Sequence, residues 1–292
     1  MAARTVPLIA NPEAGLGRTR RALPRAIMCL ERLGWQVRVH LTSRADDTAR
    51  IAARLCREHD RLLVAGGDGT VHSVLPALAG SQTVLALLPI GMANAAAREL
   101  RIPRSIPQMC RVATGDKVRA IDLGCANGVP FVLMAGMGFD AAVVHTIKPR
   151  LKRLLGPGAY VLNGLRQAAR ARPSAIRVTA DGREFELRGW LAVIANMATY
   201  TYFWKSVPSA DCADGLLDAC IFAPGGPFSK AGQLAAALAG LHLKHPLVRC
   251  LSGASLNFEC DPALPVQLDG EAAGHTPLRV TAMPRALRVL VP

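Results

Sequence analysis

The chain has 292 residues, enough for one large or two ordinary domains, each with its own core. Its composition, 51% hydrophobic and 19% charged, excludes a disordered protein. The 35 Lys and Arg residues outnumber the 21 Asp and Glu residues, and the formal net charge is +14. Such a charge favours anionic partners, although a generally basic soluble surface would also produce it. The basic runs lack the interleaved aromatic residues of nucleic-acid modules, so we expect a membrane or nucleotide partner and no nucleic acid.

The eight cysteines are scattered, and none forms a Cys-x-x-Cys pair. This spacing argues against a zinc site or a thioredoxin-like motif. The longest apolar stretch, near Leu234–Leu241, is too short to span a bilayer. The N-terminus enters a strand-like run directly, without the pattern of a cleaved signal. We therefore expect a reducing, cytoplasmic location that is peripheral to the membrane.

Strand and helix signals alternate along the first part of the chain, up to Leu123. A helical spacing of apolar residues stops at Gly34, and short apolar runs end at turn-forming residues. This alternation predicts an α/β domain with a Rossmann-like parallel sheet covered by helices on both faces. The predicted strands are residues 6–10, 35–41, 61–65 and 84–88, and the predicted helices are residues 18–33, 45–58 and a third that opens near residue 70.

The pattern changes after Leu123 to short strands interrupted by helical stretches. We expect a second, β-rich domain built as an antiparallel sandwich. The predicted domains are residues 1–123, residues 124–277, and C-terminal strands in residues 278–292 that could return to the first domain. In the second domain we predict strands at residues 131–135, 176–180, 184–187, 190–195 and 217–222, and helices at residues 148–171 and 229–244.

The most informative stretch is Leu62–Val71, an apolar strand followed by Gly66-Gly67-Asp68-Gly69-Thr70 and the start of a helix. Glycines let a phosphate approach the backbone closely, and the N–H groups of such a turn at a helix N-terminus form an anion site. Asp68 would fit there if it helps to hold a cation or a water. A tight strand–helix turn without a ligand is the alternative.

This turn resembles the signature of the diacylglycerol kinase catalytic-domain family, which also includes sphingosine and ceramide kinases. NAD kinases share the motif, but further segments in family order favour the lipid kinases. The resemblance implies the two-domain fold of NAD kinase and diacylglycerol kinase-like proteins, and transfer of the γ-phosphate of ATP to a lipid hydroxyl. The further segments are Asn11–Gly15, Pro89–Asn94 with Ala97–Leu100, Lys152–Gly156 with Ala159-Tyr160, Asp214–Asp218 and Leu268–Glu271.

By position in these motifs, the resemblance implies a set of residues around the ATP phosphates. Thr42 belongs to that set, although it could equally be a helix N-cap or a loop residue. The implied ATP-binding residues are Asn11, Thr42, Gly66, Gly67, Asp68, Gly69, Thr70, Val71, His72, Met92 and Asn94.

Three acidic residues match catalytic positions of the family. Glu271 matches the proposed general base, which a lipid hydroxyl needs because its proton must leave as attack proceeds. Without the family, Asp269-Gly270-Glu271 would be read as an ordinary hairpin turn. Together, Asp68, Asp122 and Glu271 would organise the Mg²⁺ that accompanies ATP.

A second, structural Mg²⁺ site is implied by the match at Asp211, Asp214 and Leu216. Oxygen ligands around a glycine suit a hard cation, but an Asp-Gly turn also forms without a metal.

The sequence departs from the family at three places. Met92 replaces the usual threonine, Ser73 replaces a common glutamate, and Thr201-Tyr202 replaces a Gly-Gly pair. These departures bear on the identity of the substrate and on the level of activity, while the fold is unaffected.

Two further signals are weaker. Gly136–Ala141 fits the dinucleotide pattern G-x-G-x-x-A after a strand, but a tight strand–helix junction explains it better in this position. The basic segment 148–172 interleaves Lys and Arg with Leu. It could dock on an anionic membrane surface or form an ordinary surface helix.

The sequence is thus interpreted as an ATP- and Mg²⁺-dependent lipid kinase that acts on diacylglycerol or a similar lipid, with reaction in a cleft between its domains. The alternatives are a non-catalytic lipid- or nucleotide-binding member of the family and, less favoured, an NAD kinase. A homodimer is left open.

Overall fold

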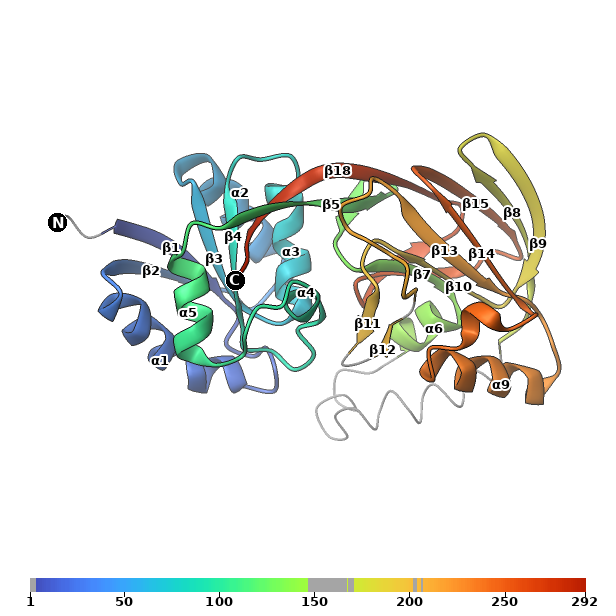
Figure 1. Ribbon diagram of the computed structural model, residues 1–292, viewed down its shortest axis with the longest axis horizontal. Helices are drawn as coiled ribbons and strands as arrows, with labels where there is room; N and C mark the ends of the chain where they lie inside the picture. The colour runs from blue at the N-terminus through green and yellow to red at the C-terminus, as the bar shows by residue number, and fades with distance from the viewer. Residues whose placement is uncertain (1–3, 147–166, 168–170, 202–203, 206) are drawn as a thin grey trace. The chain divides into compact units, whose positions relative to one another are not determined.

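The computed structural model describes residues 4–146, 167, 171–201, 204–205 and 207–292. The chain divides into two compact units, Met1–Leu123 with Met283–Pro292, and Gly124–Ala282 (Figure 1). Strands β5 (Val118–Ala126) and β18 (Leu278–Leu290) each run from one unit into the other. The final segment therefore contributes its first residues to the second unit and the rest to the first.

The first unit is built on a parallel sheet in the order β2-β1-β3-β4-β18. Strands β3 and β4 are buried along almost their whole length, as expected for strands with helices on both faces. The strands that precede β18 in the chain are β1 (Arg4–Ala10), β2 (Trp35–Leu41), β3 (Arg61–Gly66) and β4 (Val84–Pro89).

The helices of this unit pack in pairs, α1 against α5 and α2 against α3. α1 buries Leu23, Ala26 and Leu30, which share one helical face. α3 begins at Asp68, slightly earlier than predicted, so the glycine turn leads directly into its first turn. The helices are α1 (Arg18–Arg32), α2 (Ala45–Glu58), α3 (Asp68–Leu78), α4 (Ala95–Glu99) and α5 (Ile106–Thr114).

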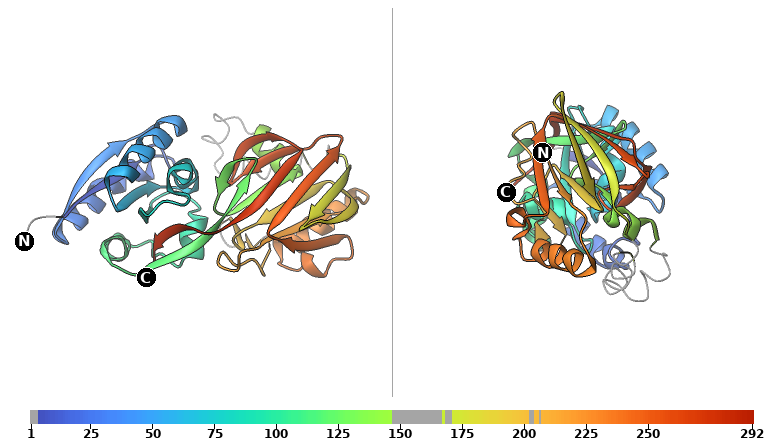
Figure 2. Two further views of the ribbon diagram at one scale, coloured as in Figure 1. Left: turned by 90° about the horizontal axis from the view of Figure 1, so that it is seen from above. Right: turned by 90° about the vertical axis from the view of Figure 1, so that its right-hand side faces the viewer.

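The second unit is a sandwich of antiparallel sheets, which Figure 2 shows from two further sides. One sheet has the order β14-β13-β10-β7-β16-β17, and in the other β18, β15, β8 and β9 are neighbours. Alternate residues of both sheets, such as Met137, Ile194 and Val178, form one apolar core between them. The strands are β6 (Val129–Phe131), β7 (Met134–Gly138), β8 (Ser174–Ala180), β9 (Arg183–Gly189), β10 (Leu191–Ala195), β13 (Leu217–Phe222), β14 (Val248–Gly253), β15 (Ser255–Asp261), β16 (Pro265–Leu268) and β17 (Glu271–His275).

Helices α6 (Phe139–Thr146) and α9 (Pro227–Leu238) and the short hairpin of β11 (Thr199–Thr201) and β12 (Trp204–Lys205) complete the described part of this unit. The predicted helix over residues 229–244 is wrong after Leu238, where α9 ends. The N–H groups of Gly240 and Leu241 bond to the carbonyls of Ala237 and Ala236, which is the Schellman ending of a helix. A short 3₁₀ turn, His242–Lys244, follows. The helix predicted over residues 148–171 lies outside the described residues except for Gln167 and Ala171.

Cys220 and Cys250 form a disulfide, which the scattered spacing of the cysteines did not indicate. They are direct partners across the antiparallel strands β13 and β14, with Cα atoms 4.2 Å apart. They are 30 positions apart in the sequence, so only the strand register brings the two thiols together.

The expected fold class is confirmed: an α/β unit with a parallel sheet precedes a β-rich antiparallel unit. Among the described residues, none of the helices combines the length and the apolar character that crossing a bilayer requires.

Candidate functional site

The order of the parallel strands singles out one edge of the first unit. The chain passes from β1 outward to β2, returns to β3 and then continues to β4 on the other side, so the winding reverses between β1 and β3. Open parallel sheets bind ligands beyond the carboxyl ends of the strands at such a reversal. Asn11 follows β1, and Gly66 ends β3.

Hydrogen bonds join the ends of three neighbouring strands at this edge. The Asn11 N–H donates to the Ala65 carbonyl (3.3 Å), and the Thr42 N–H donates to the Ala10 carbonyl (2.9 Å). The Asn11 side-chain oxygen accepts the N–H of Glu13 at 3.0 Å and shapes the turn. The Thr42 side chain is 4% exposed, and its hydroxyl has no hydrogen-bond partner within the described residues. The predicted residues Asn11 and Thr42 therefore lie on the same edge as the glycine turn.

The glycine turn is held against the loop that follows β4. The Gly91 N–H donates to the Gly66 carbonyl at 2.9 Å. A Cβ atom at Gly91 would overlap the Cα of Gly67 and lie 2.7 Å from the side-chain oxygen of Asn94. No side chain fits at this crossing, so the site requires a glycine at position 91. Gly91 is not among the ATP-binding residues expected from the sequence, although it lies in the Pro89–Asn94 motif.

Asp68 occupies the first position of α3, with its carboxylate oxygen Oδ1 accepting the Ala96 N–H at 3.2 Å. It thereby connects α3 to α4. The N–H groups of Thr70 and Val71 both donate to the Gly67 carbonyl, which closes the turn. Thr70 and Val71 are buried, whereas Gly69 and His72 are half-buried. At the departure from the family, the Ser73 hydroxyl donates to the Gly69 carbonyl at 2.9 Å, as serines within helices often do.

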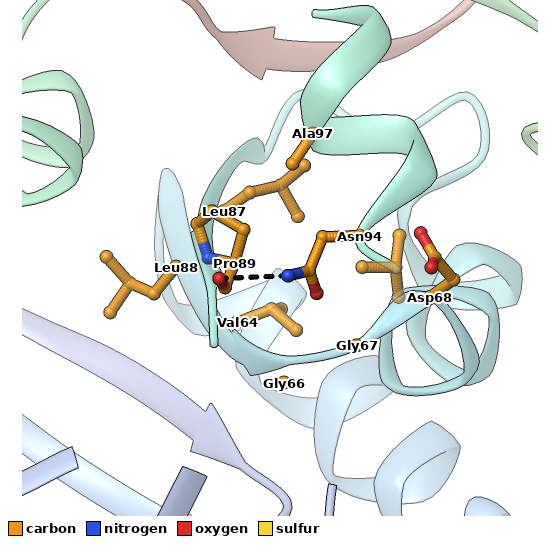
Figure 3. Close-up of a pocket in the computed structure, with 10 residues that line it drawn as sticks. Val64, Gly66, Gly67, Asp68, Leu87, Leu88, Pro89, Asn94 and Ala97 are labelled. Atoms are coloured by element: carbon orange, nitrogen blue, oxygen red, sulfur yellow. Dashed lines mark hydrogen bonds between the residues drawn. The ribbon is translucent and has the colours of Figure 1, made fainter. Parts of the chain in front are cut away.

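Asn94 lies directly across from the turn in a left-handed conformation (φ 51°, ψ 51°). Its Nδ2 donates to the carbonyls of Pro89 and Gly91, each at 3.0 Å, and Figure 3 shows the first of these bonds. The side-chain oxygen is buried and without a hydrogen-bond partner in the described part of the chain. Asn94 and Asp68 line a cavity with room for about one water molecule. Met92, two residues before Asn94, is half-buried.

Asp122 is fully buried on β5, where its carboxylate accepts the Arg285 N–H at 2.6 Å. Arg285 has a positive φ of 54°, so this bond fixes a strained position of β18. The bond gives Asp122 a clear structural role within the first unit. Within either unit, the described residues hold no group of three acidic, histidine or cysteine side chains that would bind a metal. A Mg²⁺ at Asp68 would therefore need further oxygen ligands from the phosphates of ATP and from water.

Glu271 is the first residue of β17 in the second unit, and its side chain is exposed. It pairs with Leu268 across a hairpin whose central residues are Asp269 and Gly270. From the sequence alone, a surface hairpin turn is the alternative interpretation of Asp269-Gly270-Glu271. This turn is present, and it exposes Glu271 to solvent.

The proposed second metal position is an exposed turn before β13. The Leu216 N–H donates to the Asp214 carboxylate at 2.9 Å, and the Asp214 N–H reaches the Asp211 carbonyl at 3.5 Å. One carboxylate and backbone carbonyls are oxygen donors of the kind that Mg²⁺ accepts together with several waters. The turn therefore fits a hydrated Mg²⁺, and its own hydrogen bonds also hold it without one.

Two of the predictions concern residues that the structure describes only in part. The basic segment 148–172 is described only at Gln167, Ala171 and Arg172, and of the Thr201-Tyr202 pair only the backbone of Thr201, in β11, is described.

Comparison with known proteins identifies the family. Residues 5–126 match the diacylglycerol kinase catalytic domain, and residues 134–291 match the YegS C-terminal NAD kinase beta sandwich-like domain. The chain belongs to the diacylglycerol kinase catalytic-domain family, which confirms the resemblance found in the motifs.

Curated relatives cover almost the whole chain. The diacylglycerol kinase of Staphylococcus haemolyticus (strain JCSC1435) is 28% identical over 288 residues, which is 98% of this chain and 87% of that protein. The diacylglycerol kinase of Bacillus subtilis (strain 168) is 27% identical over 289 residues, covering 98% and 95%. The homologues thus support a lipid kinase family.

Solved structures from Bacillus anthracis str. Sterne share the fold. One, described as a diacylglycerol kinase, has a TM-score of 0.81 at 24% identity and covers 99% of this chain and 97% of that chain. Another has a TM-score of 0.84 at 25% identity and covers 100% and 96%.

Proposed function

We propose that the protein is an ATP-dependent lipid kinase that phosphorylates the hydroxyl of diacylglycerol or a similar lipid and so forms a phosphatidate-type product. The observation that carries the proposal is the glycine turn, Gly66-Gly67-Asp68, at the point where the winding of the parallel sheet reverses, held against Gly91. The names of the curated relatives support the lipid as acceptor.

The first unit supplies the nucleotide-binding groups in this proposal. The phosphates of ATP approach the glycine turn and the N-terminus of α3, where backbone N–H groups and the helix dipole favour an anion. Thr42 and Asn94 offer buried side-chain oxygens at the same edge. Mg²⁺ would be held by Asp68 together with the phosphates, and when bound it neutralises the charge that develops on the transferred group.

Glu271 acts as the general base. The lipid alcohol oxygen forms a bond to the γ-phosphorus, and the bond from that phosphorus to the β,γ-bridging oxygen breaks so that ADP leaves. The hydroxyl proton passes to the Glu271 carboxylate. Such base catalysis typically contributes about 10²- to 10⁴-fold to the rate. A second Mg²⁺ at Asp211, Asp214 and Leu216 would stabilise the second unit without taking part in these steps.

The substrate class also suggests where the protein works. With a net charge of +14, the protein would associate with an anionic membrane surface, for which the basic segment 148–172 is the candidate contact. Each basic residue near such a surface is worth about 1 kcal/mol.

The decisive experiment follows labelled γ-phosphate from ATP·Mg²⁺ into extracted bacterial lipid in mixed micelles, with NAD as a parallel acceptor. We expect wild type to label the lipid and Glu271→Gln to lower kcat by about 10²-fold or more. Glu184→Gln removes another exposed carboxylate, on β9 of the same unit, and should leave kcat unchanged.

Three results would contradict the proposal in different ways. Wild-type rates in Glu271→Gln would remove Glu271 as the base. Label in NAD instead of lipid would favour an NAD kinase. A folded wild type that labels neither acceptor, with acidic lipid present, would favour a non-catalytic lipid- or nucleotide-binding member of the family.

A further inference from the structure

The turn that carries Glu271 has a tightly defined backbone. Asp269 and Gly270 have φ values of 50° and 88°, both positive, as a two-residue type I′ hairpin turn requires. Only Gly and a few polar residues such as Asp adopt this conformation readily. Glu271 follows directly, so any rotation of the turn moves its carboxylate.

The Asp269 carboxylate anchors this turn to the segment between β6 and β7. Oδ2 accepts the Val132 N–H at 2.9 Å, and Oδ1 accepts the N–H groups of Leu133 at 2.8 Å and Met134 at 3.1 Å. The Asp269 N–H donates in return to the Met134 carbonyl at 3.0 Å. Asp269 is only 9% exposed, so these charge-assisted bonds form largely away from water.

A second buried anchor comes from Gln267 on β16. Its Oε1 accepts the Gly270 N–H at 2.6 Å, and its Nε2 donates to the carboxylate of Asp140 at 2.7 Å. Gln267 is fully buried, and Asp140, in the first turn of α6, is 6% exposed. A glutamine fits between the two because it carries both an acceptor and a donor.

The network also explains the Gly136–Ala141 pattern. A Cβ atom at Gly136 would overlap the Asp140 carboxylate and lie 2.5 Å from Nε2 of Gln267. Gly136 is therefore a glycine because the Asp140–Gln267 bond crosses its backbone. This segment is the tight strand–helix junction that the sequence favoured over a dinucleotide site.

We propose that Asp269 and Gln267 are positioning residues that fix the Glu271 carboxylate for proton abstraction, with Asp140 and Gly136 supporting Gln267. This inference rests on the proposed role of Glu271 as base. A buried network of this kind is costly to break, because each lost partner leaves another polar group unsatisfied.

The chain contains a matched control hairpin. Asp181-Gly182, between β8 and β9, has φ values of 45° and 83°, and the Asp181 carboxylate accepts the N–H groups of Ala254 (3.1 Å) and Ser255 (2.8 Å). Its chemistry is the same, but the residue that follows the turn is Arg183 and no catalytic role is assigned to it. Gln233, fully buried in α9 and bonded to Trp190 (2.9 Å), is the corresponding control for Gln267.

The test compares Asp269→Asn with Asp181→Asn, since asparagine tolerates positive φ while it removes the charge and replaces one accepting oxygen with a donating NH2 group. We expect Asp269→Asn to lower kcat by about tenfold or more with the KM for ATP unchanged, because small misplacements of a catalytic group can cost about 10²-fold. Asp181→Asn should keep kcat within about twofold. If Asp269→Asn does not fold, Gln267→Met against Gln233→Met asks the same question.

A double-mutant comparison separates positioning from a merely structural role. In the Glu271→Gln background, measured with long incubations, Asp269→Asn should lower kcat by less than about twofold, because its effect acts through the missing carboxylate. If Asp269→Asn lowers kcat equally in the wild-type and Glu271→Gln backgrounds, or leaves kcat at the wild-type value, the inference is overturned while the lipid kinase function stays intact. A fully active Glu271→Gln would instead overturn the role of Glu271, and with it the positioning role.

Discussion

At the carboxyl edge of the parallel sheet, Thr42 and Asn94 each bury an oxygen that has no hydrogen-bond partner within the described residues. Burying such a group without a partner costs about 1–3 kcal/mol. In native proteins such a group calls for an explanation, and a functional role or a bound water or ion is a common one. Two such oxygens at the sheet edge that also carries the glycine turn therefore support a ligand there.

Thr42→Val tests this at a single hydroxyl. Valine has a similar shape, so the free energy of unfolding of the ligand-free protein should stay the same or rise by up to about 1 kcal/mol. Affinity for an ATP analogue with Mg²⁺ should fall by about 2- to 10-fold, as loss of one hydrogen bond predicts. Calorimetric titration and urea unfolding measure the two quantities.

Thr48→Val is the matched control for that experiment. Thr48 is 3% exposed, but its hydroxyl donates to the Arg44 carbonyl at 2.9 Å. It should therefore lose about 1 kcal/mol of stability and keep its affinity for the nucleotide. Unchanged ATP affinity in Thr42→Val would remove Thr42 from the nucleotide site.

At the scale of elements, two hairpins of the second unit have the same Asp-Gly turn but anchor it differently. The β8–β9 turn ties an exposed aspartate, Asp181, to a neighbouring strand. In the β16–β17 turn the aspartate, Asp269, is buried, and a glutamine beneath it bonds to the turn. The second hairpin is held from two sides, and this is the one that carries Glu271.

The β13–β14 pair gives a prediction of its own, because Cys220 and Cys250 join these strands. Thiol titration in denaturant should find six free thiols without reductant and all eight after reduction. Reduction, or Cys250→Ser, should destabilise the second unit by about 2–4 kcal/mol, since the cross-link restricts the unfolded chain. Eight thiols in protein prepared without reductant would contradict the bridge.

At the scale of the whole molecule, the net charge of +14 predicts binding to anionic vesicles that weakens as salt rises. At about 1 M salt the Debye length falls to about 3 Å, and binding should be lost. Replacing Lys152 and Arg153 with serine should weaken vesicle binding by at least about tenfold.

The charge-matched control replaces Arg50 and Arg54, two exposed residues of α2. Sedimentation with vesicles of neutral and of anionic lipid measures both variants. Equal losses in the two variants would assign the effect to overall charge and not to the segment 148–172.

The local features of this protein were predictable from its sequence. Apolar periodicity gave the alternating strands and helices of the first unit, and glycine turns marked the end of β3 and the β16–β17 hairpin. The motif order gave the family that the comparisons confirm. These properties depend on neighbouring residues, so a single stretch of chain contains the information.

The non-local contacts were decided by the tertiary structure. The crossing of Gly91 over Gly67, the bond from Asp122 to Arg285, the Cys220–Cys250 bridge and the Gln267–Asp140 bond each join residues far apart in the chain. Their partners are set by strand order and register, and a shift of one residue would turn each side chain to the opposite face. No local pattern encodes that register, because it follows from how whole sheets bury their apolar faces.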